Sequence, residues 1–412
     1  MIQSENINND DYPPIIVLGY SRPDSLQRLL ESLNRAVYPG HPIPLIISLD
    51  GGAAEEVIRV AEQFRFKHGK KTVIKRDTNL GLTDHILWCG DLTEKYGSAI
   101  ILEDDLMADT HFYSYACEAM NFYRDDKNIA GVGLHSPRHN QMTKVGFEPM
   151  QNGFSAYFMK KVCTWGQAWT AGQWQRFREW YRDYDEKESA QNPEVPRYIT
   201  SWLTWDKPFS FYMIENNLYF AYPYLGYTTN CADPGGVHMA RGTDMLQVPL
   251  GASNRDREEF RFCRFEHGTV FYDAFLEPEA PEIYKALDVS PDEIEIDING
   301  EKPLELIRQK KYTLTSKKPG KPIKKFRLGY RPVEKTVLNE VSNKKPSERF
   351  SEEVYFCESG SIISEKRPYY EQINYYSYYQ VENKYFTRRY LLHIVSEKFP
   401  KLRKLIFRLI SS

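Results

Sequence analysis

Short apolar runs alternate with amphipathic stretches along the first third of the chain. Runs typical of buried strands lie at 15–18, 45–50, 72–75, 99–102 and 129–134. The stretch after the first run carries an apolar stripe at helical spacing, made of Leu26, Leu29, Leu30 and Leu33. Strands that alternate with helices predict an α/β fold with a Rossmann-like, mostly parallel sheet and helices on both faces.

Polar side chains gather where these predicted strands end. Arg22, Asp50 and the acids Glu103, Asp104 and Asp105 follow the first, second and fourth runs. Ligands of such sheets bind beyond the carboxyl ends of the strands. These residues therefore mark the edge of the sheet at which we expect a site.

The three consecutive acids need a partner, because adjacent carboxylates at the end of a buried strand repel each other and are costly to bury. A hard divalent cation, Mg²⁺ or Mn²⁺, suits carboxylate oxygens and is completed by substrate phosphates. Alternatively, the acids cap the next helix or pair with surface Lys or Arg. We favour the metal, because the acids directly follow a four-residue apolar run, 99–102, in an α/β chain.

Composition changes twice further along the chain. Residues 150–275 are rich in Trp and Tyr and would build a half that binds an acceptor. From residue 281 to 412 the chain becomes basic and Tyr-rich, with fifteen Lys and Arg against five Asp and Glu in residues 301–350. We expect this part to be an extension of the catalytic region rather than a portion of it.

Bulk properties exclude some classes of protein. The formal charge of −2 gives no reason to expect a nucleic-acid partner. The amino terminus has no signal-peptide pattern, and no stretch is long enough to span a bilayer. Six well-separated cysteines without a CxxC pair are typical of isolated thiols in a reducing compartment. We expect a cytoplasmic protein.

An ordered series of short motifs runs from about Pro14 to about Arg241: "GYSRP", "SLDGG", "NLGLTDHILW", "ILEDDL", "TWGQAW", "TWDKPF" and "GGVH". Together these motifs make the chain similar to nucleotide-sugar glycosyltransferases of the glycosyltransferase-A fold. It most resembles the N-acetylglucosaminyltransferase I type and its bacterial relatives. The resemblance implies a catalytic domain at 12–280, with a nucleotide-sugar half at 12–134 and an acceptor half at 150–275.

The resemblance also implies roles for the donor-side residues. Arg22 would contact the nucleotide diphosphate, Asp50 the uracil or ribose, and His85 the nucleotide-sugar. Glu103 would face the sugar and Asp104 the ribose. Three of these have a plainer alternative: Arg22 as a solvated first-turn residue, Asp50 as a turn former, and His85 as a core histidine.

Three further roles follow from the same resemblance. Asp105 would bind the metal directly, and Asp206 would be the catalytic base. Asp206 would also suit the cap of a helix from Lys207 to Glu215. His238 belongs to "GGVH", which matches a mobile loop that closes over the donor. The family enzyme has a serine where this chain has His238, which would contact the donor or bind the metal.

The expected activity is transfer of a sugar, such as GlcNAc, from a UDP-sugar to a hydroxyl of a glycan or lipid-linked acceptor in surface-polysaccharide biosynthesis. It would be metal-dependent and inverting. One alternative is a nucleotidyltransferase acting on sugar phosphates, which should carry a glycine-rich, basic phosphate loop where "GYSRPDS" stands. The other is a non-catalytic carbohydrate-binding protein, which would leave the three acids unexplained.

Within the last fifteen residues, 398–412, the part after Pro400 places apolar residues on one face of a helix and four cations around the rest. Such a helix suits an anionic membrane interface, which would make the protein peripheral on the inner face of the cell membrane. The alternative is a terminal helix that docks on the protein's own surface. The basic run at 317–325 favours the membrane.

Overall fold

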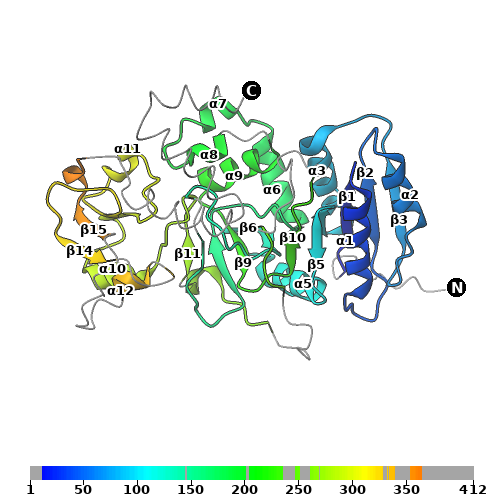
Figure 1. The fold of residues 1–412 in the computed structure, drawn as a ribbon, viewed down its shortest axis with the longest axis horizontal. Coiled ribbons are helices and arrows are strands. Elements are labelled where there is room, and N and C mark those ends of the chain that lie inside the picture. The colour runs from blue at the N-terminus through cyan, green and yellow to red at the C-terminus, as the bar shows by residue number, and fades with distance from the viewer. Residues whose placement is uncertain are drawn as a thin grey trace, which may run out of the picture.

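The computed structural model describes residues 12–143, 146–200, 204–234, 246–250, 260–268, 270–327, 332, 334–338 and 353–363. Their centre is a nine-stranded sheet in the order β11-β7-β9-β6-β8-β4-β1-β2-β3 (Figure 1). In chain order its strands are β1 Ile15–Gly19, β2 Leu45–Leu49, β3 Lys71–Lys75, β4 Ser98–Glu103, β6 Ile129–Gly133, β7 Ala156–Met159, β8 Gln167–Thr170, β9 Tyr219–Pro223 and β11 Phe271–Tyr272. The predicted α/β class with a large, mostly parallel sheet is confirmed.

Parallel pairing holds along the run β3-β2-β1-β4, as the alternating pattern predicts. Beyond β4 the sheet differs from the simple expectation. β8 inserts antiparallel between β4 and β6, and β7 runs antiparallel to β9. The four residues of β8 are too short to show a period in the sequence, so only long-range pairing identifies them as a strand.

Helices cover both faces of the sheet, and the side chains of β1 point alternately to the two faces. Ile15 and Val17 face one apolar cluster, which contains α1 Pro23–Arg35, α2 Glu55–Gln63 and α5 Phe112–Tyr123. Ile16 and Leu18 face the other, which contains α3 Gly81–Asp91, α6 Ala171–Tyr181 and α9 Asp206–Glu215. Successive strand residues point to opposite faces, so a strand buried on both faces reads as a continuous apolar run.

Register places the carboxyl ends of three strands side by side. Leu18 of β1 pairs with Glu103 of β4, and Gly19 pairs with Leu49 of β2. The chain then turns after β4 into β5, Leu106–Ala108, which pairs antiparallel with β10, Thr228–Asn230. This small ribbon brings the segment after residue 230 to the acidic end of β4, where the Cys231 N–H donates to the Asp105 carbonyl at 2.9 Å.

Short helices lie between the longer elements. These are α4 Thr93–Tyr96, α7 Glu186–Ser189 and α8 Arg197–Thr200, and α7 and α8 lie near α9 at the top of Figure 1. Among the described residues, no helix is long and apolar enough to cross a bilayer. All six cysteines are free thiols.

A second, four-stranded sheet lies on the left in Figure 1 and has the order β12-β13-β15-β14. It comprises β12 Ile294–Asp297, β13 Tyr312–Thr315, β14 Lys324–Arg327 and β15 Glu353–Glu358, with helices α10 Pro281–Leu287, α11 Leu304–Ile307 and α12 Lys335–Leu338. Its Leu314 and Phe356 belong to the same apolar cluster as Tyr272 of the large sheet. The core is therefore continuous, and a domain boundary at residue 280 stays a prediction.

Candidate functional site

Two of the three acids, Asp104 and Asp105, are paired with an arginine that follows the neighbouring strand. Arg22 directly follows the turn after β1 and is the residue before α1. Its Nη2 donates to Asp104 Oδ1, and its Nη1 lies 3.3 Å from Asp105 Oδ2. Because β1 and β4 are parallel neighbours, their carboxyl ends bring this cation to the acids. The structure therefore places Arg22 beside the acidic cluster, as the sequence predicts.

Electrostatics at this strand end disfavour full ionisation. Burial raises the pKa of Asp104 to about 6, although Arg22 opposes the shift. Burial also raises the pKa of Glu103 well above its ordinary value, and Asp105 and Asp104 raise it further. Added positive charge would favour the ionised forms of both carboxyls. The cluster is thus incompletely compensated by Arg22 alone.

Asp105 has an oxygen that the protein leaves unused. Its Oδ1 is buried and has no hydrogen-bond partner, whereas its Oδ2 faces Arg22. A buried oxygen without a partner costs free energy unless another group satisfies it. Within the described ranges, no group of three or more His, Cys, Asp or Glu side chains is arranged to hold a metal ion. Mg²⁺ and Mn²⁺ fit a single carboxylate when substrate phosphates and waters supply the other ligands.

Sequence reasoning missed a second ion pair beside the first. Arg28, on α1, donates from Nη1 and Nη2 to Asp233 at 2.9 and 2.5 Å, and Ser25 Oγ donates to the same carboxylate at 2.7 Å. The hydrogen bonds from Arg28 lower the pKa of Asp233. Ser25 and Arg28 are three residues apart on one helix, so the sequence alone indicates that their side chains can contact the same partner. Only the fold reveals that residue 233 is their partner.

Asp206 lies close to the acidic strand end. It is the first residue of α9 and is buried, and Thr204 Oγ1 donates to its Oδ1. The side chain of the preceding Trp205 hydrogen-bonds to Glu103, which joins the start of α9 to the end of β4. The expectation that Asp206 caps the helix is wrong, because the N-cap position is Trp205 and no side-chain cap bond forms. The amino-terminal end of a helix stabilises negative charge at this position.

Asp50 is engaged by the backbone of a neighbouring loop. Its carboxylate accepts the N–H groups of Gly51, Leu80 and Gly81 at 2.9, 2.9 and 3.0 Å. A Cβ at position 51 would collide with the backbone of Thr78, so only glycine allows this approach. In this structure Asp50 therefore holds the loop that leads into α3 against the end of β2. Its contact with uracil or ribose stays a prediction.

His85, on α3, has the environment of a core histidine. The ring Nε2 lies 2.7 Å from Ser48 Oγ, and the side chain is buried. Burial lowers its pKa to about 4. Nearby, the Arg76 guanidinium stacks 3.9 Å over the ring of Trp88, a pair that the sequence pattern did not single out. The predicted contact of His85 with a nucleotide-sugar remains untested by this geometry.

Two predictions fall outside the described residues. His238 lies in the stretch 235–245, and the amphipathic segment 398–412 lies in the carboxyl-terminal stretch after residue 363. Both stay predictions from the sequence.

The solved structures described here are distantly similar to this chain. No family model and no curated protein matches the chain. S. aureus TarS 1–349 in complex with UDP-GlcNAc is similar over 56% of this chain and 60% of that chain, with 14% identity and a TM-score of 0.37. The mannosyltransferase PcManGT from Pyrobaculum calidifontis, in complex with GDP-Man and Mn²⁺, is similar over 43% of this chain and 49% of that chain, with 11% identity and a TM-score of 0.29.

Mouse xyloside xylosyltransferase 1 is similar over 50% of this chain and 83% of that chain, with 12% identity and a TM-score of 0.34. The match to TarS 1–349 extends over about three fifths of that chain. The mannosyltransferase and the xylosyltransferase are glycosyltransferases by name. At such TM-scores the similarities establish neither the activity nor the substrate of this chain.

Proposed function

We propose that the chain is a nucleotide-sugar glycosyltransferase, with a UDP-sugar as donor and a hydroxyl of a glycan or lipid-linked molecule as acceptor. The observation that carries the proposal is the buried, unpartnered Oδ1 of Asp105 at the carboxyl end of β4, beside the guanidinium of Arg22. A carboxylate oxygen and an arginine at one strand end match the needs of a metal-bound diphosphate. The ordered motifs of the sequence support the same proposal.

On the donor side, Arg22 would bind the diphosphate through the guanidinium N–H groups that do not contact Asp104 or Asp105. Asp105 would be the protein ligand of Mn²⁺ or Mg²⁺. The ion would supply positive charge that stabilises the departing nucleotide diphosphate. Asp104 would keep the guanidinium of Arg22 in place, since the two are directly hydrogen-bonded.

On the acceptor side, Asp206 would act as the general base. It would accept the proton of the acceptor hydroxyl while that oxygen attacks the anomeric carbon from the face opposite the diphosphate. The hydroxyl of Thr204 donates to Oδ1 of this carboxylate and so holds the side chain in place at the start of α9. A single displacement of this kind inverts the anomeric configuration.

The test is calorimetric titration of UDP into the full-length protein with and without Mn²⁺. We expect Mn²⁺ to strengthen UDP binding to the wild type at least tenfold and to leave uridine binding unchanged. Asp105→Asn should lose the Mn²⁺ effect. Asp125→Asn is the matched control, because Asp125 is an exposed aspartate in the turn before β6, at the other end of the sheet. Equal Mn²⁺ effects in both variants would contradict the metal assignment.

A further inference from the structure

A second arginine contacts the proposed metal ligand, but at a different group from Arg22. Arg28 Nη2 lies 3.4 Å from the backbone carbonyl oxygen of Asp105, whereas Arg22 faces the carboxylate of the same residue. A guanidinium makes stronger hydrogen bonds to a carboxylate than to a neutral carbonyl. Oδ1 of Asp105 is nevertheless buried without a hydrogen-bond partner. Another group therefore holds Arg28 away from this oxygen.

That group is the carboxylate of Asp233. Nη1 and Nη2 of Arg28 donate to its two oxygens, Oδ1 at 2.9 Å and Oδ2 at 2.5 Å, and Ser25 Oγ donates to Oδ2 at 2.7 Å. A two-point contact of this kind fixes the orientation of the guanidinium as well as its position. The hydrogen bonds from Arg28 lower the pKa of Asp233, so this carboxylate is ionised at neutral pH. Asp233 thus compensates the charge of Arg28 and orients it toward the carbonyl of Asp105.

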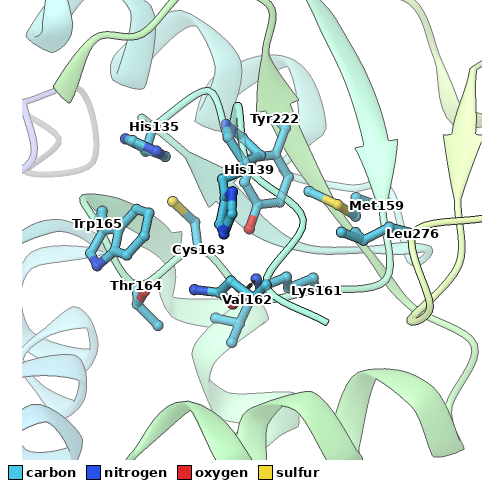
Figure 2. A pocket seen from close by; sticks show the side chains of 12 residues that line it. His135, His139, Met159, Lys161, Val162, Cys163, Thr164, Trp165, Tyr222 and Leu276 are labelled. Atoms are coloured by element: carbon cyan, nitrogen blue, oxygen red, sulfur yellow. Dashed lines mark hydrogen bonds between the residues drawn. The ribbon is translucent and has the colours of Figure 1, made fainter. Parts of the chain in front are cut away.

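The backbone that carries Asp233 is held in place by its neighbours. Asp233 follows β10, and β10 pairs with β5 directly after the acids of β4. At the start of β10, the carbonyl of Thr228 lies 3.2 Å from His135 Nδ1, and the hydroxyl of Thr228 donates to the carbonyl of Trp165. Figure 2 shows His135 and Trp165, which come from the loop after β6 and from the loop between β7 and β8. Asp233 therefore meets Arg28 at a position that the fold sets, and not the ion pair alone.

Loss of the charge at position 233 would change the partner of Arg28. The guanidinium is already at the carbonyl of Asp105, so a change of side-chain rotamer brings it within reach of the carboxylate of the same residue. The hydrogen bond to Asp233 contributes most to the raised pKa of Arg28, and the charge of Asp105 raises it as well. A guanidinium at Oδ1 would occupy the oxygen that a divalent ion needs and would repel that ion.

We propose that Asp233 is a positioning residue for metal binding: by holding Arg28 on the backbone of Asp105, it keeps Oδ1 of Asp105 open to the divalent ion that accompanies the donor. The inference rests on the proposed function, and it adds a residue that acts on the metal site through Arg28. A direct role of Asp233 as a metal ligand, or a purely structural link between α1 and β10, makes a different prediction. Neither of these depends on where Arg28 goes once it is released.

The test is calorimetric titration of UDP into the full-length protein with and without Mn²⁺, with the ratio of the two affinities as the readout. We expect Asp233→Asn to lower this ratio from at least about tenfold to about twofold or less, because the released Arg28 occupies Oδ1. Arg28→Met and the double variant Asp233→Asn/Arg28→Met should keep at least about half of the wild-type ratio, since the competing cation is absent. Loss of a merely structural contact would not be restored by the second substitution.

Glu56→Gln and Arg59→Met are the matched controls, because these two residues form an exposed ion pair on α2. Both variants should leave the ratio of affinities unchanged. Urea unfolding of the metal-free variants measures whether each is folded, and Asp233→Ser takes the place of Asp233→Asn in both arms if the latter is not.

Two results would overturn the role of Asp233 while the wild type keeps its Mn²⁺ effect: a wild-type ratio in Asp233→Asn, or a ratio in the double variant as low as that of Asp233→Asn. The second result would identify Asp233 as a metal ligand or as a structural link. Absence of an Mn²⁺ effect in the wild type would instead overturn the proposed function, and this inference with it.

Discussion

The four-stranded sheet contains a buried ion pair whose removal should be measurable. Lys317 Nζ lies 2.6 Å from Asp297 Oδ2 and 2.7 Å from the carbonyl of Lys302. The two side chains are 4% and 0% exposed. The other buried cation nearby, Lys302, is already paired with Asp273 and Glu295. Asp297 therefore depends on Lys317 for compensation of its charge.

Lys317→Met keeps the unbranched apolar stem and removes the ammonium group. Asp297 would retain hydrogen bonds from Thr315 Oγ1 at 2.8 Å and from the N–H of Lys302 at 2.9 Å, but no cation. Removal of one partner from a buried pair costs about 3–5 kcal/mol. Protonation offers an escape from that cost.

A carboxyl with an ordinary aspartate pKa of about 3.9 takes up a proton at a cost of about 4 kcal/mol at pH 7 and about 1.5 kcal/mol at pH 5. This cost is an upper limit on the charge contribution. We therefore expect Lys317→Met to lower the free energy of unfolding by about 3–4 kcal/mol at pH 7 and by about half of that or less at pH 5.

Urea unfolding followed by circular dichroism, with hydrogen exchange of β13 and β15 as a local measure, tests this expectation at both pH values. Lys318→Met is the matched control, because Lys318 is the adjacent, exposed lysine. That variant should change stability by less than about 0.5 kcal/mol. If Lys317→Met at pH 7 behaved like Lys318→Met, or lost as much stability at pH 5 as at pH 7, the charge argument would be refuted.

Three other predictions concern the site and the terminus. Asp206→Asn should cut sugar transfer by roughly 10²–10⁴-fold with UDP affinity unchanged, and near-normal turnover would exclude it as the base. Because burial lowers the pKa of His135, the folded state favours the neutral ring, and the stability that this preference contributes is fully present above pH 6.5 and is lost as the pH falls toward 3. Between pH 7 and pH 5 the free energy of unfolding of the wild type, measured with urea, should therefore fall by about 2 kcal/mol more than that of His135→Asn. A chain ending at Phe399 should float less than the full chain with anionic liposomes, and equal flotation would remove the membrane role of residues 398–412.

The sequence was sufficient where one strand and its immediate flank decide the outcome. Continuous apolar runs predicted β1, β2 and β4, and the meeting of parallel carboxyl ends predicted the grouping of Arg22 with Asp104 and Asp105. Both inferences depend on local pattern plus one rule of sheet geometry. Neither requires knowledge of which distant residues pair.

The sequence was insufficient where a polar group has a choice of partners. Asp50 at a strand end is compatible with a ligand, yet its carboxylate accepts the N–H of the next residue and two N–H groups of a loop about thirty residues away. Asp233 gave no signal of its own, because its partner Arg28 is 205 positions earlier. Long-range hydrogen bonds leave no periodicity in the sequence, so the fold must be known before they can be assigned.

The unequal contacts of Arg22 indicate how the acidic strand end would accept a donor. Its contact with Asp104 is a direct charge-assisted hydrogen bond, whereas the 3.3 Å separation from Asp105 exceeds the 2.7–2.9 Å typical of such bonds. The weaker contact is the one that a competing group would displace first. Loss of that contact would free Oδ2 of Asp105 beside the unpartnered Oδ1, while Asp104 continued to hold the guanidinium. We therefore expect Asp104→Asn to weaken UDP binding by loosening Arg22, and Asp105→Asn to weaken it only when Mn²⁺ is present.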